Sequence, residues 1–171
     1  MWHDRGMEHL PEGHDERAIA IDLGVIWSDG GPTPVLLQDD RTAFLAFYLA
    51  PIDPSGDAVG IVEWLGCWAT TFGYPNYEAI EGHRLWNRGL SETYNDAVEV
   101  LNSSWIAGME TANRVHHQHD SSRFAALRHF LLKFQDDTFE CAAEGYRIET
   151  SNDPLDAVVA RLVARLLGQP Q

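Results

Sequence analysis

The chain has 171 residues, of which 44% are hydrophobic and 22% charged, as in one ordinary globular domain. Its net charge of −14 argues against nucleic acid and anionic membranes as partners, because both need a basic surface. Two cysteines, Cys67 and Cys141, are too few for a disulfide framework, and no apolar run approaches the length of a membrane span. We therefore expect a cytoplasmic protein.

The N-terminal segment is polar, is interrupted by proline and glycine, and lacks the apolar core of a signal peptide. We expect a mobile arm over residues 1–16 and a single folded domain over residues 17–171.

The first part of the domain predicts consecutive strands. Hydrophobic residues alternate from Ile19 to Trp27, which is typical of a strand with one buried face. Residues 35–38 and 42–50 flank a short turn, and the apolar run 61–72 indicates one central strand. Short connections of this kind favour an antiparallel meander.

The middle of the chain mixes helical and extended patterns. Residues 77–82 predict a short helix, and residues 96–102 predict a further strand. Ser103 or Ser104 can cap the helix that follows, because a serine hydroxyl accepts hydrogen bonds from the first free amides of a helix. One face of that helix is expected to carry Trp105, Met109, Ala112 and His116, which makes His116 a buried residue.

Residues 128–149 predict a β-hairpin with a definite register. Apolar side chains alternate on both arms, so Phe134 is expected opposite Phe139. The same register places Lys133 opposite Glu140 and His129 opposite Glu144, so that opposite charges meet.

The last element predicted is an amphipathic helix. Asp153 is expected to cap it, Pro154 to occupy its first position, and Gly168 to end it. Its apolar face consists of Leu155, Val158, Val159, Leu162, Val163 and Leu166. These elements together predict a single α+β domain, with an antiparallel sheet of about six or seven strands and two longer helices on one face.

Residues 114–120, RVHHQHD, form the densest group of potential metal ligands. One interpretation is the end of a helix, where polar and cationic side chains suit the exposed carbonyl groups. The other is a metal site formed by His117, His119 and Asp120. The chain has no HExxH motif and no paired CxxC, so we favour the interpretation without metal and expect no cofactor.

Two further side chains are candidates for acid–base chemistry. His83 stands in a glycine-flanked loop, where either a functional role or a surface turn is expected. Glu63 stands in an apolar strand, so it needs either a raised pKa or an ion pair with an arginine. Neither a GxSxG motif nor a phosphate-binding glycine motif is present.

Three stretches of the chain, FGYPNYEAIEGHRLWNRGL, EVLNSSWIAGMETANRVH and RHFLLKFQDDTFECAA, carry a resemblance. They resemble a family of uncharacterised small bacterial proteins that share GxPNxE…GHxL, NSxW…NxxH and HF…FxDxxFEC segments. The resemblance spans about residues 60–143. In that pattern the residue before the hairpin aspartate is often histidine, whereas this chain has Gln135.

The resemblance brings no activity, but it emphasises a set of polar residues in aromatic surroundings. Such a mixture suits a small-molecule pocket and equally a polar network that fixes the fold. The residues are His83, Asn102, Asn113, His116, His129, Asp136 and Glu140.

These observations favour a non-catalytic binding or accessory protein that recognises a small ligand or a protein partner. The alternative is a metal-dependent hydrolase that uses His83, His116 and His117 or His119 with a carboxylate.

Overall fold

The computed structural model describes residues 15–50, 58–93 and 97–168, which form an α+β fold with two antiparallel sheets. A five-stranded sheet has the order β1-β6-β7-β8-β5. Its strands are β1 (Arg17–Ala20), β6 (Ala97–Leu101), β7 (Arg128–Lys133), β8 (Thr138–Ala143) and β5 (Ala69–Gly73).

A four-stranded sheet has the order β2-β3-β4-β9. Its strands are β2 (Val35–Gln38), β3 (Thr42–Tyr48), β4 (Val59–Leu65) and β9 (Gly145–Ser151). The α+β class is thus confirmed, but the strands are divided between two sheets instead of lying in one.

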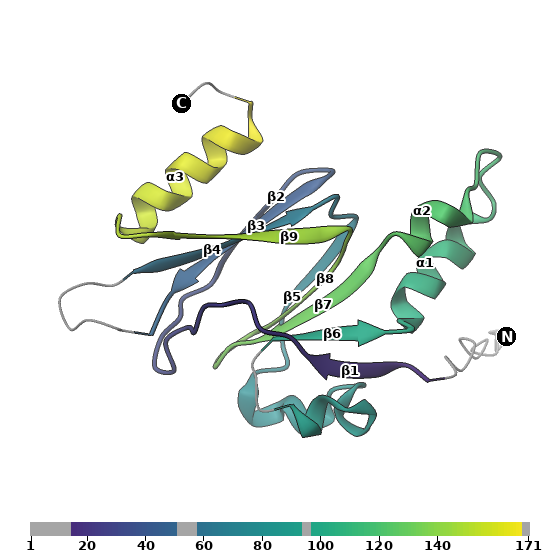
Figure 1. Ribbon diagram of the computed structural model, residues 1–171, viewed down its shortest axis with the longest axis horizontal. Helices are drawn as coiled ribbons and strands as arrows, with labels where there is room; N and C mark the ends of the chain where they lie inside the picture. Colours follow the sequence, from purple (N-terminus) through teal and green to yellow (C-terminus); the bar gives the residue numbers. More distant parts are fainter. Residues whose placement is uncertain (1–14, 51–57, 94–96, 169–171) are drawn as a thin grey trace, which may run out of the picture.

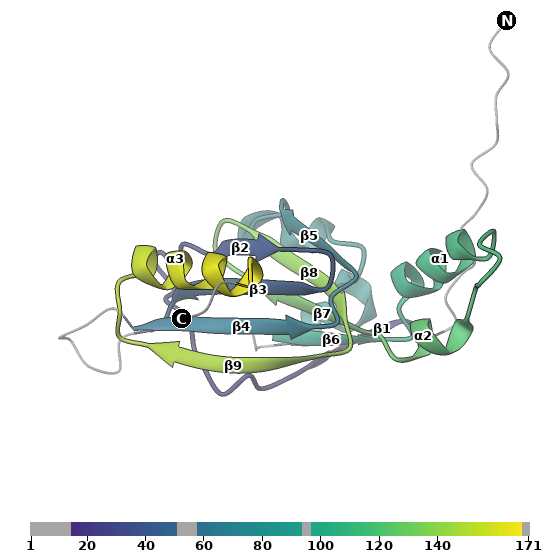
Figure 2. The same cartoon turned by 90° about the horizontal axis from the view of Figure 1, so that it is seen from above.

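The helices occupy three different places. Helix α3 (Leu155–Leu166) covers the outer face of the four-stranded sheet (Figures 1 and 2). Helices α1 (Ser104–Asn113) and α2 (Ser121–Ala125) lie side by side at one end of the molecule (Figures 1 and 2). Three short 3-10 helices, η1 (Tyr77–Gly82), η2 (Trp86–Arg88) and η3 (Leu90–Glu92), cover part of the outer face of the five-stranded sheet. The two longer helices therefore do not share one face.

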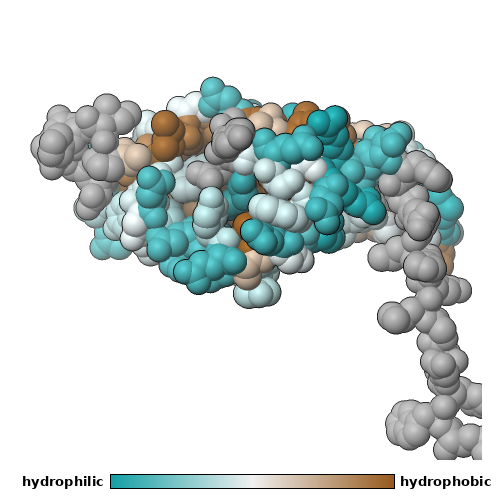
Figure 3. Space-filling view, turned by 90° about the horizontal axis from the view of Figure 1, so that it is seen from below, coloured by the Kyte–Doolittle hydropathy of each residue, from teal (hydrophilic) through white to brown (hydrophobic). Residues whose placement is uncertain are grey.

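The main hydrophobic core lies between the two sheets. Trp64 of β4 is fully buried and packs against Phe130 and Phe139 of the facing sheet, with ring centroids 5.0 and 5.6 Å away. Burial of such large rings is the main stabilising contribution in a fold of this size. Hydrophilic side chains cover most of the face shown in Figure 3, where hydrophobic areas are small and separate. No described helix is long and apolar enough to cross a membrane.

The run 61–72 is not one strand, as we expected, but the junction between the two sheets. It is divided into β4 and β5 at Gly66, whose φ of +56° only glycine adopts easily. A Cβ at this position would lie 2.6 Å from the side chain of Glu144. The continuous apolar pattern arises because both halves contribute to the same inter-sheet core.

The β7–β8 hairpin is confirmed, but its expected register is wrong by two residues. Lys133 is paired with Thr138, and Leu131 with Glu140. Phe134 begins the turn, where its N–H donates to the carbonyl of Asp137 at 2.8 Å. A shift of two residues leaves every side chain on the same face of the sheet, so alternation alone does not distinguish the two registers.

Two further boundaries differ from expectation. The first strand ends at Ala20, and Trp27 forms only an isolated bridge with Leu49. Helix α3 begins at Leu155, and Asp153 pairs with Arg161 at 2.8 Å instead of capping the helix.

The expected N-terminal arm falls outside the described residues up to position 14. Glu16, which we assigned to the arm, lies in the folded domain with 7% of its surface exposed.

Candidate functional site

His129 lies at the centre of a buried polar network on the outer face of the five-stranded sheet. It belongs to β7 and is fully buried. Its Nδ1 lies 2.8 Å from Ser103 Oγ, and its Nε2 lies 2.8 Å from Glu140 Oε2. The ring of Trp105 packs edge-on against the imidazole, with centroids 5.0 Å apart.

Glu140 receives three polar contacts, one from β7 and two from adjacent residues that follow η1. Besides His129, its carboxylate contacts His83 Nε2 at 3.4 Å and Arg84 at 2.6 Å. Burial alone would raise the pKa of Glu140, but the hydrogen bonds from both histidines and the charge of Arg84 outweigh it and lower the pKa to about 2. Glu140 is therefore a carboxylate at neutral pH.

The partners of each histidine indicate which ring nitrogen carries the proton. His83 Nδ1 accepts the backbone N–H of Leu85, so its Nε2–H points to Glu140. His129 Nε2–H donates to Glu140, and its Nδ1 accepts the hydroxyl of Ser103. Ser103 in turn accepts the N–H of Ile106 as the cap of α1, which confirms one of the two capping residues expected. Each ring nitrogen therefore already has a protein partner.

Ser103, His129 and Glu140 are connected in the order of a Ser–His–acid relay, but the surroundings do not suit acyl transfer. An oxyanion needs free N–H donors beside the nucleophile. The adjacent amide, that of Ser104, donates to Glu16 Oε1 at 2.8 Å. The carboxylate of Glu16 thus occupies the position where an oxyanion would need a donor. The network instead connects α1 and the segment of η1, η2 and η3 to the five-stranded sheet.

The structure brings together three of the six predicted binding residues, His83, His129 and Glu140. Asn102 has a φ of +52° and donates to the carbonyl of Asp15, outside the network. Asn113 is the last residue of α1, and its side chain contacts His119 at 3.0 Å.

The prediction for His116 is wrong. Helix α1 ends at Asn113, so His116 lies in the turn that follows and is exposed. Its ring stacks on that of His117, with centroids 4.7 Å apart. His116 therefore does not lie on a face of α1, as the expected burial required.

The residues considered for a metal site have different contacts in the fold. Asp120 caps α2 by accepting the N–H of Ser122, and His119 lies 3.7 Å from Glu110. Within the described ranges, no three histidine, cysteine or acidic side chains are grouped as a metal site would require. Glu63 pairs with Arg165 at 2.9 Å, the ion pair considered for it from the sequence.

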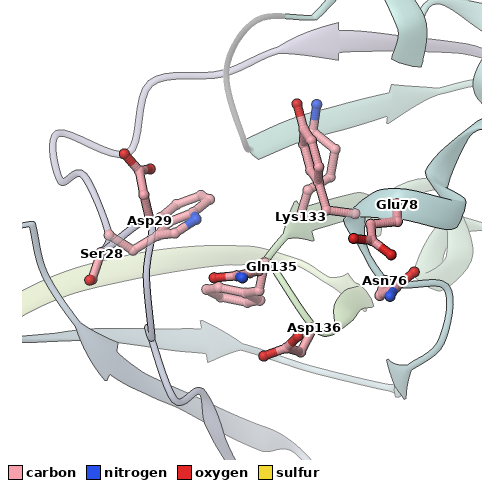
Figure 4. Close-up of a pocket in the computed structure, with 10 residues that line it drawn as sticks. Ser28, Asp29, Asn76, Glu78, Lys133, Gln135 and Asp136 are labelled. Atoms are coloured by element: carbon pink, nitrogen blue, oxygen red, sulfur yellow. The ribbon is translucent and has the colours of Figure 1, made fainter.

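A second candidate site is a cavity of about 470 Å³ beside the β7–β8 turn. We call it the Trp27 cavity. Ser28 and Asp29 lie on one side, Asn76 and Glu78 on the other, and Gln135 and Asp136 between them (Figure 4). The remaining lining residues are Trp27, Tyr77, Lys133 and Phe134.

The walls of the Trp27 cavity are tied to the sheets by backbone contacts. Ser28 N–H donates to the carbonyl of Tyr48 at 3.0 Å, and Tyr77 N–H donates to that of Gln135 at 3.0 Å. The ring of Trp27 packs against Phe134, with centroids 5.2 Å apart. Three segments distant in the sequence are thus fixed around one space.

The polar groups of the Trp27 cavity differ in their contacts, and Asn76 Oδ1 accepts the N–H of Ala79 as the cap of η1. Among the described residues, the carboxylates of Asp29, Glu78 and Asp136 make no hydrogen bond or ion pair. The ammonium of Lys133 donates to the carbonyl and hydroxyl oxygens of Thr93, at 3.3 and 3.2 Å. Three carboxylates and one ammonium give the cavity two net negative charges.

Sequence reasoning found only part of this cavity. Asp136 was among the emphasised residues, and Asn76, Glu78 and Phe134 lie in the GxPNxE and FxD segments of the resemblance. The remaining wall was missed because Trp27 was assigned to a regular strand. No pattern in the sequence links residues 27–29 to residues 76–78 and 133–136.

Comparison of the chain with protein-family models, characterised proteins and solved structures finds no match.

Proposed function

We propose that this protein is a non-catalytic binding protein that holds a small molecule in the Trp27 cavity. The observation that carries the proposal is a cavity of about 470 Å³ in which the carboxylates of Asp29, Glu78 and Asp136 make no hydrogen bond to a described residue, while the walls are fixed by backbone hydrogen bonds. Small-molecule sites of this kind combine an apolar surface with a few polar groups in a space of roughly 300–1,000 Å³.

The composition of the lining supports this function. The almost completely buried rings of Trp27 and Phe134 lie behind the apolar part of the lining, and Tyr77 exposes its ring. Asn76 and Gln135 add amide groups. The buried network of His129 and Glu140 supports the site indirectly, because β7 and β8 carry both the network and the turn that lines the cavity.

The experiment is a fragment screen by NMR on the purified protein, with amide shifts as readout. Binding fragments should shift the amides of Ser28, Tyr77 and Asp136 together. Replacing Ser28 with Phe should fill the cavity and abolish these shifts, and Ser91→Phe, at an exposed position on η3, should leave them unchanged. Fragments that shift residues elsewhere, or that bind Ser28→Phe equally well, would contradict the proposal.

We further propose that the protein works in the cytoplasm. Cys67 and Cys141 are both free and buried in the inter-sheet core, and burial raises the pKa of the Cys67 thiol to about 11. A reducing compartment suits thiols kept in this form. Fractionation of cells that express the protein with an epitope tag tests this location.

A further inference from the structure

The lining of the Trp27 cavity specifies the chemical class of its ligand. We propose that the ligand is a small organic cation, an amine or quaternary ammonium compound that also carries an oxygen acceptor. This inference rests on the proposed binding function and extends it from a site to a kind of molecule.

The charge of the cavity favours a cation over a neutral or anionic ligand. Asp29 and Glu78 lie on opposite sides of the cavity with Asp136 between them, and all three carboxylates are exposed (Figure 4). The single cation of the lining, Lys133, is only 7% exposed and directs its ammonium to Thr93. An anion would meet three carboxylates. The net charge of −14 also attracts cations from solution.

The aromatic residues of the lining distinguish an organic cation from a metal ion. Within the part of the chain that the structure describes, the cavity carboxylates are not grouped closely enough to chelate a metal. The lining instead contains aromatic rings, of which Tyr77 is exposed and Trp27 is exposed at 6% of its surface. Carboxylates together with aromatic rings recognise alkylammonium groups, because the ring faces attract positive charge and also accept apolar substituents.

Trp27 adds a requirement for an acceptor. Only 6% of its surface is exposed, yet its indole N–H makes no hydrogen bond to any described residue. The indole nitrogen of Trp27 is not among the enclosed polar atoms, so it reaches accessible surface, and because Trp27 lines the cavity its N–H is available to an acceptor on a ligand. A hydroxyl or carbonyl oxygen on the ligand would complete the site.

The test compares choline with 3,3-dimethylbutan-1-ol, in which a carbon atom replaces the charged nitrogen while shape and hydroxyl are retained. Binding is followed by the amide shifts of Ser28, Tyr77 and Asp136. We expect choline to bind at least about tenfold more tightly, as the loss of a charge-paired contact implies. The variants Glu78→Gln and Asp136→Asn should each weaken choline binding by about threefold to tenfold and leave the alcohol unaffected.

The matched control is Glu81→Gln, which removes an exposed carboxylate from the same 3-10 helix but outside the cavity. It should leave choline binding unchanged. Equal or tighter binding of the neutral alcohol in the cavity would overturn the cation inference and leave the proposed function standing. Absence of choline binding at millimolar concentration would also overturn it, whereas the fragment screen with Ser28→Phe decides the proposed function separately. If Glu81→Gln and Glu78→Gln weakened choline binding equally, the effect would come from the overall charge of the protein. That result would contradict binding of choline in the Trp27 cavity.

Discussion

His129 Nε2 lies 2.8 Å from Glu140 Oε2, although the residue paired with Glu140 across the β7–β8 ladder is Leu131. The contact is therefore diagonal, between side chains on the same face of neighbouring strands. Its other end reaches Ser103, so one imidazole joins two strands to the start of α1. We expect the contacts of His129 to affect the stability of the protein, the change of that stability with pH, and the attachment of α1 to the sheet.

The first prediction concerns Glu140 and pH. Its pKa is lowered from 4.5 to about 2 in the folded protein, so its stabilising contribution is complete above about pH 4.5 and disappears as the pH falls towards 2. The shift corresponds to roughly 3 kcal/mol. Glu140→Gln should therefore lower the free energy of unfolding by about 2–3 kcal/mol at pH 7 and by much less near pH 2. Urea denaturation across this pH range measures the difference.

The control for this prediction is Glu144→Gln, at an exposed carboxylate without a hydrogen bond among the described residues. It should change stability by less than about 0.5 kcal/mol at every pH. An equal loss for Glu140→Gln at pH 7 and at pH 2 would show that shape, not charge, determines its contribution.

The second prediction concerns the hydrogen bond between Ser103 and His129. Ser103→Ala should cost about 1–2 kcal/mol, because it removes both the cap of α1 and this bond. His129→Leu removes the same bond from the other side. A double-mutant cycle should therefore show a coupling of about 1 kcal/mol.

Ser104→Ala is the matched control, because its hydroxyl contacts Glu16 and not His129. Its effect should add to that of His129→Leu within about 0.5 kcal/mol. Additivity in the Ser103 cycle as well would mean that the 2.8 Å contact contributes nothing to stability.

The third prediction concerns the histidines that follow α1. His116 is exposed, so His116→Ala should change stability by less than about 0.5 kcal/mol. His119 is half-buried and contacts Asn113, so His119→Ala should cost about 1 kcal/mol. Thermal unfolding of the two single variants shows which substitution costs more stability. A larger loss of stability for His116→Ala would contradict this assignment.

Local patterns predicted the elements that depend on neighbours in sequence. The amphipathic stripe predicted α3, alternation predicted β7 and β8, and a serine before an apolar run predicted the cap at Ser103. The division of the strands between two sheets was not predictable from the sequence. The residues on both sides of Gly66 pack into the same core, so the apolar pattern continues across the junction.

The candidate site shows the same limit. Polar residues in aromatic surroundings identified His83, His129 and Glu140, which do converge. The Trp27 cavity depends on contacts between distant segments, such as the bond between Tyr77 N–H and the carbonyl of Gln135. Such contacts follow from the packing of the two sheets. The hydrophobic periodicity of a single sequence does not predict that packing.

The last prediction applies one substitution at two glycines and expects opposite signs. Gly89 has a φ of +97°, and a Cβ there would collide with the backbone oxygen of Ala18 in β1. Gly89→Ala should therefore lower the free energy of unfolding by about 2–4 kcal/mol, since both the backbone and the neighbouring strand must shift. Gly108 lies inside α1 with no atom within 4 Å of an added Cβ.

Gly108→Ala should raise the free energy of unfolding by about 0.5–1 kcal/mol, because alanine loses less conformational entropy than glycine when a helix forms. Chemical denaturation of the two variants beside the unchanged protein measures both effects. A stabilising Gly89→Ala would show that the 3-10 segment does not lie against β1 as described. A destabilising Gly108→Ala would show that this face of α1 is covered in solution.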